Sequence, residues 1–197
     1  MAILETAKNE WLEFQEEQVE NEKKHRTGTS HQMQNHQWRP LDTGVMKINT
    51  DAAIPTKSAG AGLGMIARDC EGNIVQARGI RKYSSAGAEM EEADALRQGL
   101  LMAREAGWRR IEMQTDCKAA IETICKTGLG ETPIGTIIED IRHLSDMFQD
   151  CTFSFVYRDG NRSAHKMAQF ATKLVSKVIW KQSFPLWLKE SIQEDNR

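Results

Sequence analysis

Three acidic residues stand where a carboxylate is unusual. Asp51 lies near the end of the alternating, strand-like segment KINTDAA, and Asp116 follows a second strand-like segment, IEMQT. Glu92 lies on a helix-compatible segment, where it shares one face with Leu96 and Ala103. An acid in such apolar surroundings is costly unless a cation or hydrogen bonds compensate its charge. If the two strand-like segments are neighbours in a sheet, the three carboxylates converge at one end of it.

Converging carboxylates favour a metal site. Like charges packed together repel one another and raise each other's pKa unless a cation is present. A set of oxygen ligands suits Mg²⁺ or Mn²⁺. Two such ions activate water and stabilise the leaving oxygen in phosphodiester cleavage. The residues therefore suggest metal-dependent hydrolysis of a phosphodiester.

Each acid also has a simpler explanation. Asp116 is a suitable N-cap for the helix expected to begin there. Glu92 belongs to an acidic cluster over 89–94, which suits the positive end of a helix dipole. Asp51 can be a turn residue before a loop over 52–59. Taken singly these acids are weak signals, and the arrangement of strand acid, helix acid and strand acid is the more specific observation.

The elements that must position these acids follow from residue periodicity. Alternation predicts strands over 44–53, 60–69, 74–80, 110–115 and 151–157. Apolar residues at helical spacing predict helices over 88–106, 116–127, 133–148 and 161–177. Short connections make the first three strands an antiparallel meander. This order predicts an α/β fold, with a five-stranded mixed sheet flanked by helices.

Residue composition and patterning divide the chain into three parts. Residues 1–40 read as a helix over 3–24 followed by a polar linker. Residues 41–180 hold the predicted α/β domain. Residues 181–197 form a tail whose apolar stretch, 184–188, is expected to dock on the domain.

Composition excludes several classes of protein. Of the 197 residues, 40% are hydrophobic, which is enough to build a core. No apolar run approaches the ~20 residues of a membrane span, and the N-terminus lacks a signal-peptide pattern, so we expect an intracellular protein of the nucleus or cytoplasm. The four cysteines form no CxxC pair, which argues against a structural zinc module. The net charge is −2, yet residues 158–190 carry seven bases against two acids, typical of either a polyanion partner or a solvated helix face.

Five motifs occur in one order: KINTDAA, GAGLGMIARDCEGNIV, EEADALRQGLLMAREAG, IEMQTDCKAAIETI and FVYRDGNRSAHKMAQFA. In order and spacing they resemble the ribonuclease H superfamily. More narrowly, they are similar to the plant reverse-transcriptase-like RNase H domains of non-LTR retroelements. The resemblance covers roughly residues 44–178, and Trp38-Arg39-Pro40 resembles the segment that usually leads into that domain.

The resemblance implies hydrolysis of the RNA strand of an RNA–DNA hybrid with two Mg²⁺ or Mn²⁺ ions. It places the catalytic, metal-binding acids on Asp51, Glu92 and Asp116, with Asp51 bridging both ions. Glu92 is chosen over the neighbouring acids because Glu92-Ala93-Asp94-Ala95-Leu96 matches the acid-x-x-Ala-Leu pattern of the family. The implied nucleic-acid contacts are Arg158, Asn161, Arg162, Lys166 and Lys173.

Two features depart from the family. His165 stands where a fourth catalytic acid is expected, and a neutral imidazole suits Mg²⁺ poorly. Asp159, in the adjacent loop, is a possible substitute, and a surface or helix-end role is the alternative for His165. The short loop 157–161 leaves no room for the histidine-bearing loop of bacterial relatives, and no basic protrusion stands between 128 and 133.

These departures leave three hypotheses open. The first is a metal-dependent hybrid endoribonuclease. The second is a nucleic-acid-binding module of retroelement origin whose catalysis is weakened or lost. The third is a retroelement fragment that serves as a scaffold through residues 1–24.

Overall fold

The computed structural model describes residues 42–56, 59–126 and 133–195. Three predictions fall outside these ranges: the helix over 3–24, the linker over 25–40, and the absence of a basic protrusion between 128 and 133. Of that last segment, only residue 133 is described. The strands are β1 (Met46–Ala53), β2 (Ala61–Arg68), β3 (Ile74–Lys82), β4 (Arg110–Thr115), β5 (Asp150–Phe155) and β6 (Lys177–Trp180). The helices are α2 (Ala88–Ala106), α3 (Lys118–Cys125), α4 (Pro133–Ser145), the 3₁₀ turn η1 (Arg158–Gly160), α5 (Arg162–Ala171) and α6 (Leu186–Asp195).

The strands form one mixed sheet in the order β5-β4-β1-β2-β3-β6. The antiparallel meander β1–β2–β3 is confirmed, and β1 also pairs in parallel with β4, which pairs in parallel with β5. The mixed α/β class is therefore confirmed. The count of five strands was wrong, because β6 adds a sixth by pairing antiparallel with β3.

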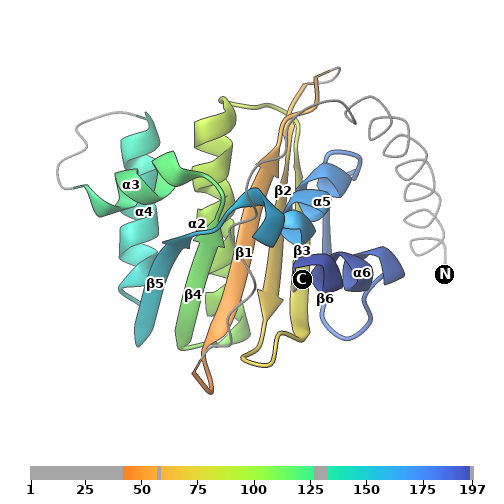
Figure 1. The fold of residues 1–197 in the computed structure, drawn as a ribbon. Helices are drawn as coiled ribbons and strands as arrows, with labels where there is room; N and C mark the ends of the chain where they lie inside the picture. Colours follow the sequence, from red (N-terminus) through yellow and green to blue (C-terminus); the bar gives the residue numbers. More distant parts are fainter. Residues whose placement is uncertain (1–41, 57–58, 127–132, 196–197) are drawn as a thin grey trace, which may run out of the picture. The chain divides into compact units, whose positions relative to one another are not determined.

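Helices cover both faces of this sheet (Figure 1). Helix α2 packs on β1, β2 and β4, with α3 and α4 beside it, whereas α5 packs on β1, β2 and β3 and carries α6. The expected helix over 161–177 is shorter than predicted: α5 ends at Ala171, and the chain then turns into β6. The apolar stretch over 184–188 leads into α6, where Trp187 and Leu188 are buried.

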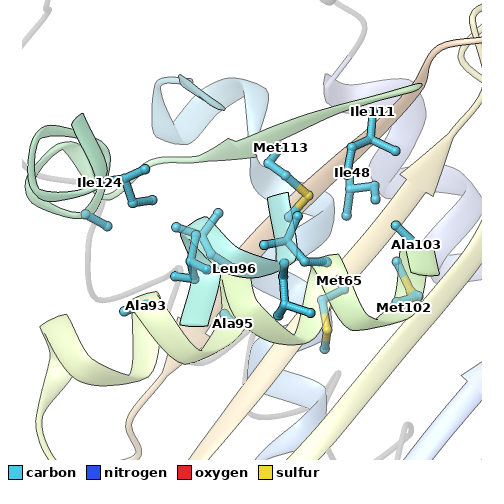
Figure 2. Packing of buried hydrophobic residues seen from close by; sticks show 14 of the residues in the cluster. Ile48, Met65, Ala93, Ala95, Leu96, Met102, Ala103, Ile111, Met113 and Ile124 are labelled. Atoms are coloured by element: carbon cyan, nitrogen blue, oxygen red, sulfur yellow. The ribbon is translucent and has the colours of Figure 1, made fainter. Parts of the chain in front are cut away.

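The main core lies between the sheet and α2 (Figure 2). Ile48 of β1, Met113 of β4 and Leu96 of α2 are fully inaccessible to solvent there. The opposite face is closed by Phe170 of α5, which packs against the rings of Trp180 and Trp187. Both sides of the central strands are thus covered, which explains why all eight residues of β2 are buried.

Two glycines of β2 set how closely α5 approaches the sheet. A Cβ at Gly64 would come within 2.4 Å of the backbone nitrogen of Ala168 and 2.5 Å of the carbonyl oxygen of Ala164. A Cβ at Gly62 would meet the same helix backbone. Helix α5 therefore lies directly on the backbone of β2, and its first turn is held close to β1.

We predict that Gly64→Ala lowers the free energy of unfolding by about 1–3 kcal/mol, because neither backbone can give way. Urea denaturation measures the change. Gly79→Ala is the matched control: Gly79 pairs with Gly64 in the sheet, but its added Cβ would meet mainly the flexible end of Met167, at 2.6 Å. An equal loss in both variants would contradict this account of α5 packing.

Candidate active site

The structure brings the three acids together. Asp51 lies in β1, Glu92 in the second turn of α2, and Asp116 directly after β4, and each offers an oxygen within 4.8 Å of the other two. The parallel pairing of β1 with β4 places the carboxyl ends of both strands at one edge of the sheet. Asp51 is fully buried, and the side chain of Asp116 is 8% exposed.

The simpler explanations of these acids do not fit the geometry. Asp51 stands inside β1 and not in a turn. The N-cap position of α3 is Cys117, so Asp116 is not the cap of that helix. The carboxylate of Asp116 instead accepts hydrogen bonds from Arg158 at 2.8 Å and from Asn161 at 3.1 Å.

The acidic side chains at the start of α2 point in different directions. Glu92 reaches the sheet edge, where its carboxylate accepts long hydrogen bonds, each of 3.4 Å, from the Ala52 amide and the Thr115 hydroxyl. Glu91 turns the other way and pairs with Lys82 at 2.6 Å. Glu89 is exposed. Among these three acids, Glu92 is the one that joins the cluster, as the pattern over 92–96 predicted.

The cluster is electrostatically strained. Burial, followed by the nearby charges of Asp51 and Asp116, raises the pKa of Glu92 to about 9. Burial also raises the pKa of Asp51, against the lowering effect of its hydrogen bond with His165. Such a site favours either proton uptake or a bound cation.

The side chains of Arg158 and His165 lie against the cluster. Arg158 donates to Asp116, and its Nη1 lies 3.6 Å from Asp51 Oδ1, while more than half of its side chain stays exposed. His165 Nδ1 lies 2.7 Å from Asp51 Oδ2, and Arg158 Nη2 lies 2.8 Å from Nδ1 and 3.0 Å from Nε2 of the same ring. We assign the tautomer in which Nδ1–H donates to Asp51, which leaves Nε2 as the nitrogen that accepts from Arg158. His165 therefore belongs to the site and is not an unrelated surface residue.

Asp159 does not take the place of a fourth acid. It lies in η1, is exposed, and pairs with Arg162 at 2.6 Å. The loop 157–161 is short, as expected, and its 3₁₀ turn directs Arg158 toward the cluster.

The other candidate nucleic-acid contacts differ in position. Asn161 is fully buried, and its contact with nucleic acid stays a prediction. Arg162 is exposed, Lys166 is partly exposed and pairs with Glu194 at 2.8 Å, and Lys173 is partly exposed near the other end of the helix. The candidate nucleic-acid contacts at the surface are therefore Arg158, Arg162, Lys166 and Lys173.

Behind the cluster lies a chain of buried, hydrogen-bonded polar side chains, and Asn161 is its end nearest the carboxylates. Its amide donates to Asp116 and to the Thr50 carbonyl, and its oxygen accepts from Asn49 at 3.1 Å. Asn49 in turn accepts from Arg68 at 2.7 Å, and Arg68 lies 3.6 Å from Asp195.

Sequence reasoning did not single out Asn49, Arg68 or Asp195. Asn49 had a usable signal, because it stands two residues before Asp51 and so shares its face of the strand. Arg68 had one too, since it ends a strand-like segment of small and apolar residues. Asp195 had none, because its partners lie far from it in the sequence.

The donor set fits a hard divalent cation. It consists of carboxylate oxygens, and Asp51 Oδ1 is buried without a hydrogen-bond partner, 3.6 Å from Arg158 Nη1, so this oxygen can still accept a cation. The side of the cluster that holds His165 offers an imidazole instead of a further carboxylate, so it fits such an ion less well.

A comparison with protein families matches residues 49–171 to the family described as reverse transcriptase-like. The chain belongs to the reverse transcriptase-like family. The match includes all three acids, His165 and most of the polar chain, but not Asp195. The narrower resemblance to plant non-LTR retroelement domains stays a prediction. No curated protein matches this reverse transcriptase-like chain.

Solved structures share the fold. RNase H1 from the halophilic archaeon Halobacterium salinarum is 23% identical, with a TM-score of 0.60, over 64% of this chain and 96% of that one. LC11-RNase H1, solved with an RNA/DNA hybrid, is 17% identical, with a TM-score of 0.56, over 63% of this chain and 94% of that one. The prototype foamy virus protease–reverse transcriptase is 18% identical, with a TM-score of 0.55, over 75% of this chain and 23% of that one.

Within the described ranges, none of the helices is both long and apolar enough to cross a bilayer. The nuclear or cytoplasmic location and the part boundaries at 40 and 180 stay predictions.

We predict that Glu92→Gln stabilises the reverse transcriptase-like domain at high pH in the presence of a chelator. Because the pKa of Glu92 rises from 4.5 to about 9 on folding, the folded state keeps a proton that the unfolded chain releases, so stability falls as pH rises between these values. The glutamine removes this loss. We expect no gain near pH 5 and on the order of 1–3 kcal/mol near pH 9, measured by urea denaturation.

Glu89→Gln is the control, because this exposed acid stands in the first turn of the same helix. A gain for Glu92→Gln that is equal at both pH values would contradict the electrostatic origin of the effect.

Proposed function

We propose that the protein is a divalent-metal-dependent endoribonuclease that hydrolyses the RNA strand of RNA–DNA hybrids. The observation that carries the proposal is the convergence of Asp51, Glu92 and Asp116 at the carboxyl edge of the sheet. Membership of the reverse transcriptase-like family supports it, as does the shared fold with an RNase H1 solved with an RNA/DNA hybrid.

The three carboxylates are the proposed ligands of Mg²⁺ or Mn²⁺, and they would hold up to two such ions. When bound, such ions supply an activated water and stabilise the leaving oxygen. Asn161 fixes the orientation of Asp116, and the Ala52 amide and Thr115 hydroxyl hold Glu92. These contacts set the carboxylates in place before any ion arrives.

Arg158 is the proposed contact to the phosphate that is cut. Its side chain is exposed, yet it lies against the carboxylate cluster, so its guanidinium faces both the site and the solvent. A guanidinium matches the geometry of a phosphate better than a lysine does. Arg162, Lys166 and Lys173 extend the basic surface along and just beyond α5, where they would bind neighbouring phosphates.

His165 takes a double role in this proposal. It donates to Asp51 and so holds one orientation of that carboxylate. Its second nitrogen accepts from Arg158, which keeps the guanidinium at the mouth of the site. Recognition of RNA against DNA would depend on the 2′-hydroxyl of the strand lying in this mouth.

The same two residues favour a second candidate function, that of a nucleic-acid-binding module without catalysis. Arg158 and His165 already make hydrogen bonds to Asp116 and Asp51, so they offset part of the charge that would otherwise attract a metal ion. In that case the basic surface would still bind hybrids, with an affinity that falls as salt rises.

We predict that the purified protein cuts a labelled RNA–DNA hybrid in Mg²⁺ or Mn²⁺ and that Asp51→Asn lowers the rate by ~100-fold or more, which is about 2.7 kcal/mol of transition-state stabilisation. The readout is the RNA product on a denaturing gel. Asp159→Asn is the control, because Asp159 is an exposed carboxylate outside the cluster. Cleavage that survives Asp51→Asn would remove the proposed site, whereas binding without cleavage in either metal would establish the module.

We also predict that His165→Asp lowers the Tm in a chelator but enlarges the rise in Tm on adding Mg²⁺. Without metal, the new carboxylate repels Asp51 and loses the donated hydrogen bond; with metal, it adds an oxygen ligand. We expect the Mg²⁺-dependent rise to exceed that of the natural protein by about 2–4 °C, which corresponds to about 1 kcal/mol.

His143→Asp makes the same change at an exposed position of α4 and serves as the control. If the two variants show the same response to Mg²⁺, His165 does not face the metal site.

A further inference from the structure

The start of α5 is capped in an unusual way. Asn161 occupies the N-cap position, yet its side chain makes no capping hydrogen bond to its own helix. An asparagine there ordinarily accepts from a first-turn amide, since these amides lack partners within the helix. The side chain of Asn161 is instead directed at Asp116, Thr50 and Asn49.

Asp195 of α6 performs the capping that Asn161 does not. Its carboxylate accepts from the backbone amide of Ser163 at 3.3 Å and from the Ser163 hydroxyl at 2.5 Å. Asp195 itself is 3% exposed, and Ser163 is fully buried. A residue from another helix therefore satisfies the first turn of α5 and leaves Asn161 available to the carboxylate cluster.

The same carboxylate also faces Arg68. This guanidinium is 1% exposed, and within the described part of the chain Asp195 is the acid that pairs with it, at 3.6 Å. Two of its nitrogens, Nε and Nη1, have no hydrogen-bond partner, while Nη2 donates to Asn49. Burial lowers the pKa of Arg68 and raises that of Asp195. Because burial disfavours the charged form of both residues, this ion pair is weak evidence for a contribution to stability. It suggests instead that the pair has a specific structural role.

The contacts form two routes from one residue to the site. One runs from Asp195 through Ser163 to the first turn of α5, which follows the N-cap Asn161 and carries His165. The other runs through Arg68 and Asn49 to the side chain of Asn161. Both converge on the amide that holds Asp116.

We propose that Asp195 is a positioning residue for the carboxylate cluster, acting through Ser163 and Arg68 to keep Asn161 hydrogen-bonded to Asp116. This inference rests on the proposed function only for its kinetic readout. Without the Asp195 carboxylate, the side-chain oxygen of Asn161, at the N-cap, is a replacement acceptor for the first turn of α5. If Asn161 turns to cap its own helix, Asp116 loses its amide donor.

The test compares Mn²⁺ binding by calorimetry in the natural protein and in Asp195→Asn, at a temperature where both are folded. We expect the affinity for Mn²⁺ to fall by about 3–10-fold in Asp195→Asn, because loss of an outer partner of a metal ligand typically weakens binding. In hybrid cleavage we expect kcat to fall while KM for the hybrid stays unchanged, since the surface bases of α5 are untouched.

A second readout needs no metal. The side-chain amide signal of Asn161, identified in ¹⁵N-labelled protein by its loss in Asn161→Ala, should shift in Asp195→Asn. If Asp195→Asn does not fold, Ser163→Ala replaces it, and we expect smaller changes in the same direction because only one of the two routes is weakened.

Ile192→Ala is the matched control. Ile192 is buried on α6 one turn before Asp195, so the variant loosens the helix without touching the polar chain. Equal changes in Ile192→Ala and Asp195→Asn would overturn the proposal by assigning the effect to docking of α6. An unshifted Asn161 signal with unchanged Mn²⁺ affinity would overturn it as well. If the protein binds Mn²⁺ but does not cut hybrids, the proposed function fails while the binding and amide comparisons still decide the role of Asp195.

Discussion

The repulsion among three carboxylates at one edge of the sheet is the constraint on which the structure depends. Asp51 is fully buried and Glu92 and Asp116 are mostly so, and oxygens of all three lie within 4.8 Å. Such an arrangement is stable only if positive charge or donated hydrogen bonds surround it. Arg158, His165 and Asn161 supply these from one short segment at the start of α5. The close packing of that helix on Gly62 and Gly64 is what holds the segment within reach.

Much of the site followed from residue types and spacing. Asp51 could be placed because it stands near the end of a strand-like segment, and Asp116 because it follows one. Glu92 could be placed because it shares a helical face with Leu96 and Ala103 and begins the acid-x-x-Ala-Leu pattern of the family. Their convergence depended on one condition, that the first and fourth strands are neighbours, which the parallel pairing of β1 with β4 fulfils. Sequence reasoning did not show that Asn161 is buried, because a polar residue at a helix start gives no sign of whether it faces solvent or a neighbouring strand.

The errors in the fold have a similar origin. Apolar residues at helical spacing continue past Ala171, so the periodicity extended α5 to Lys177. The pair of β-branched residues, Val178 and Ile179, was the available signal for a strand, but four residues form a strand only when a partner such as β3 lies alongside. Arg68 and Asp195 likewise acquire meaning only through tertiary contact, which periodicity does not report.

The polar chain behind the cluster also has a consequence for folding. Asn49 and Asn161 are 112 positions apart, and the Ser163–Asp195 bond joins the first turn of α5 to the last described helix. Contacts of such long range form late, because the chain must lose loop entropy before they can stabilise it. Strands β1 to β4 and helix α2 all lie within residues 46–115, and the three acids lie within residues 51–116. During synthesis on the ribosome, the carboxylates would therefore be brought together well before α6 exists to complete their support.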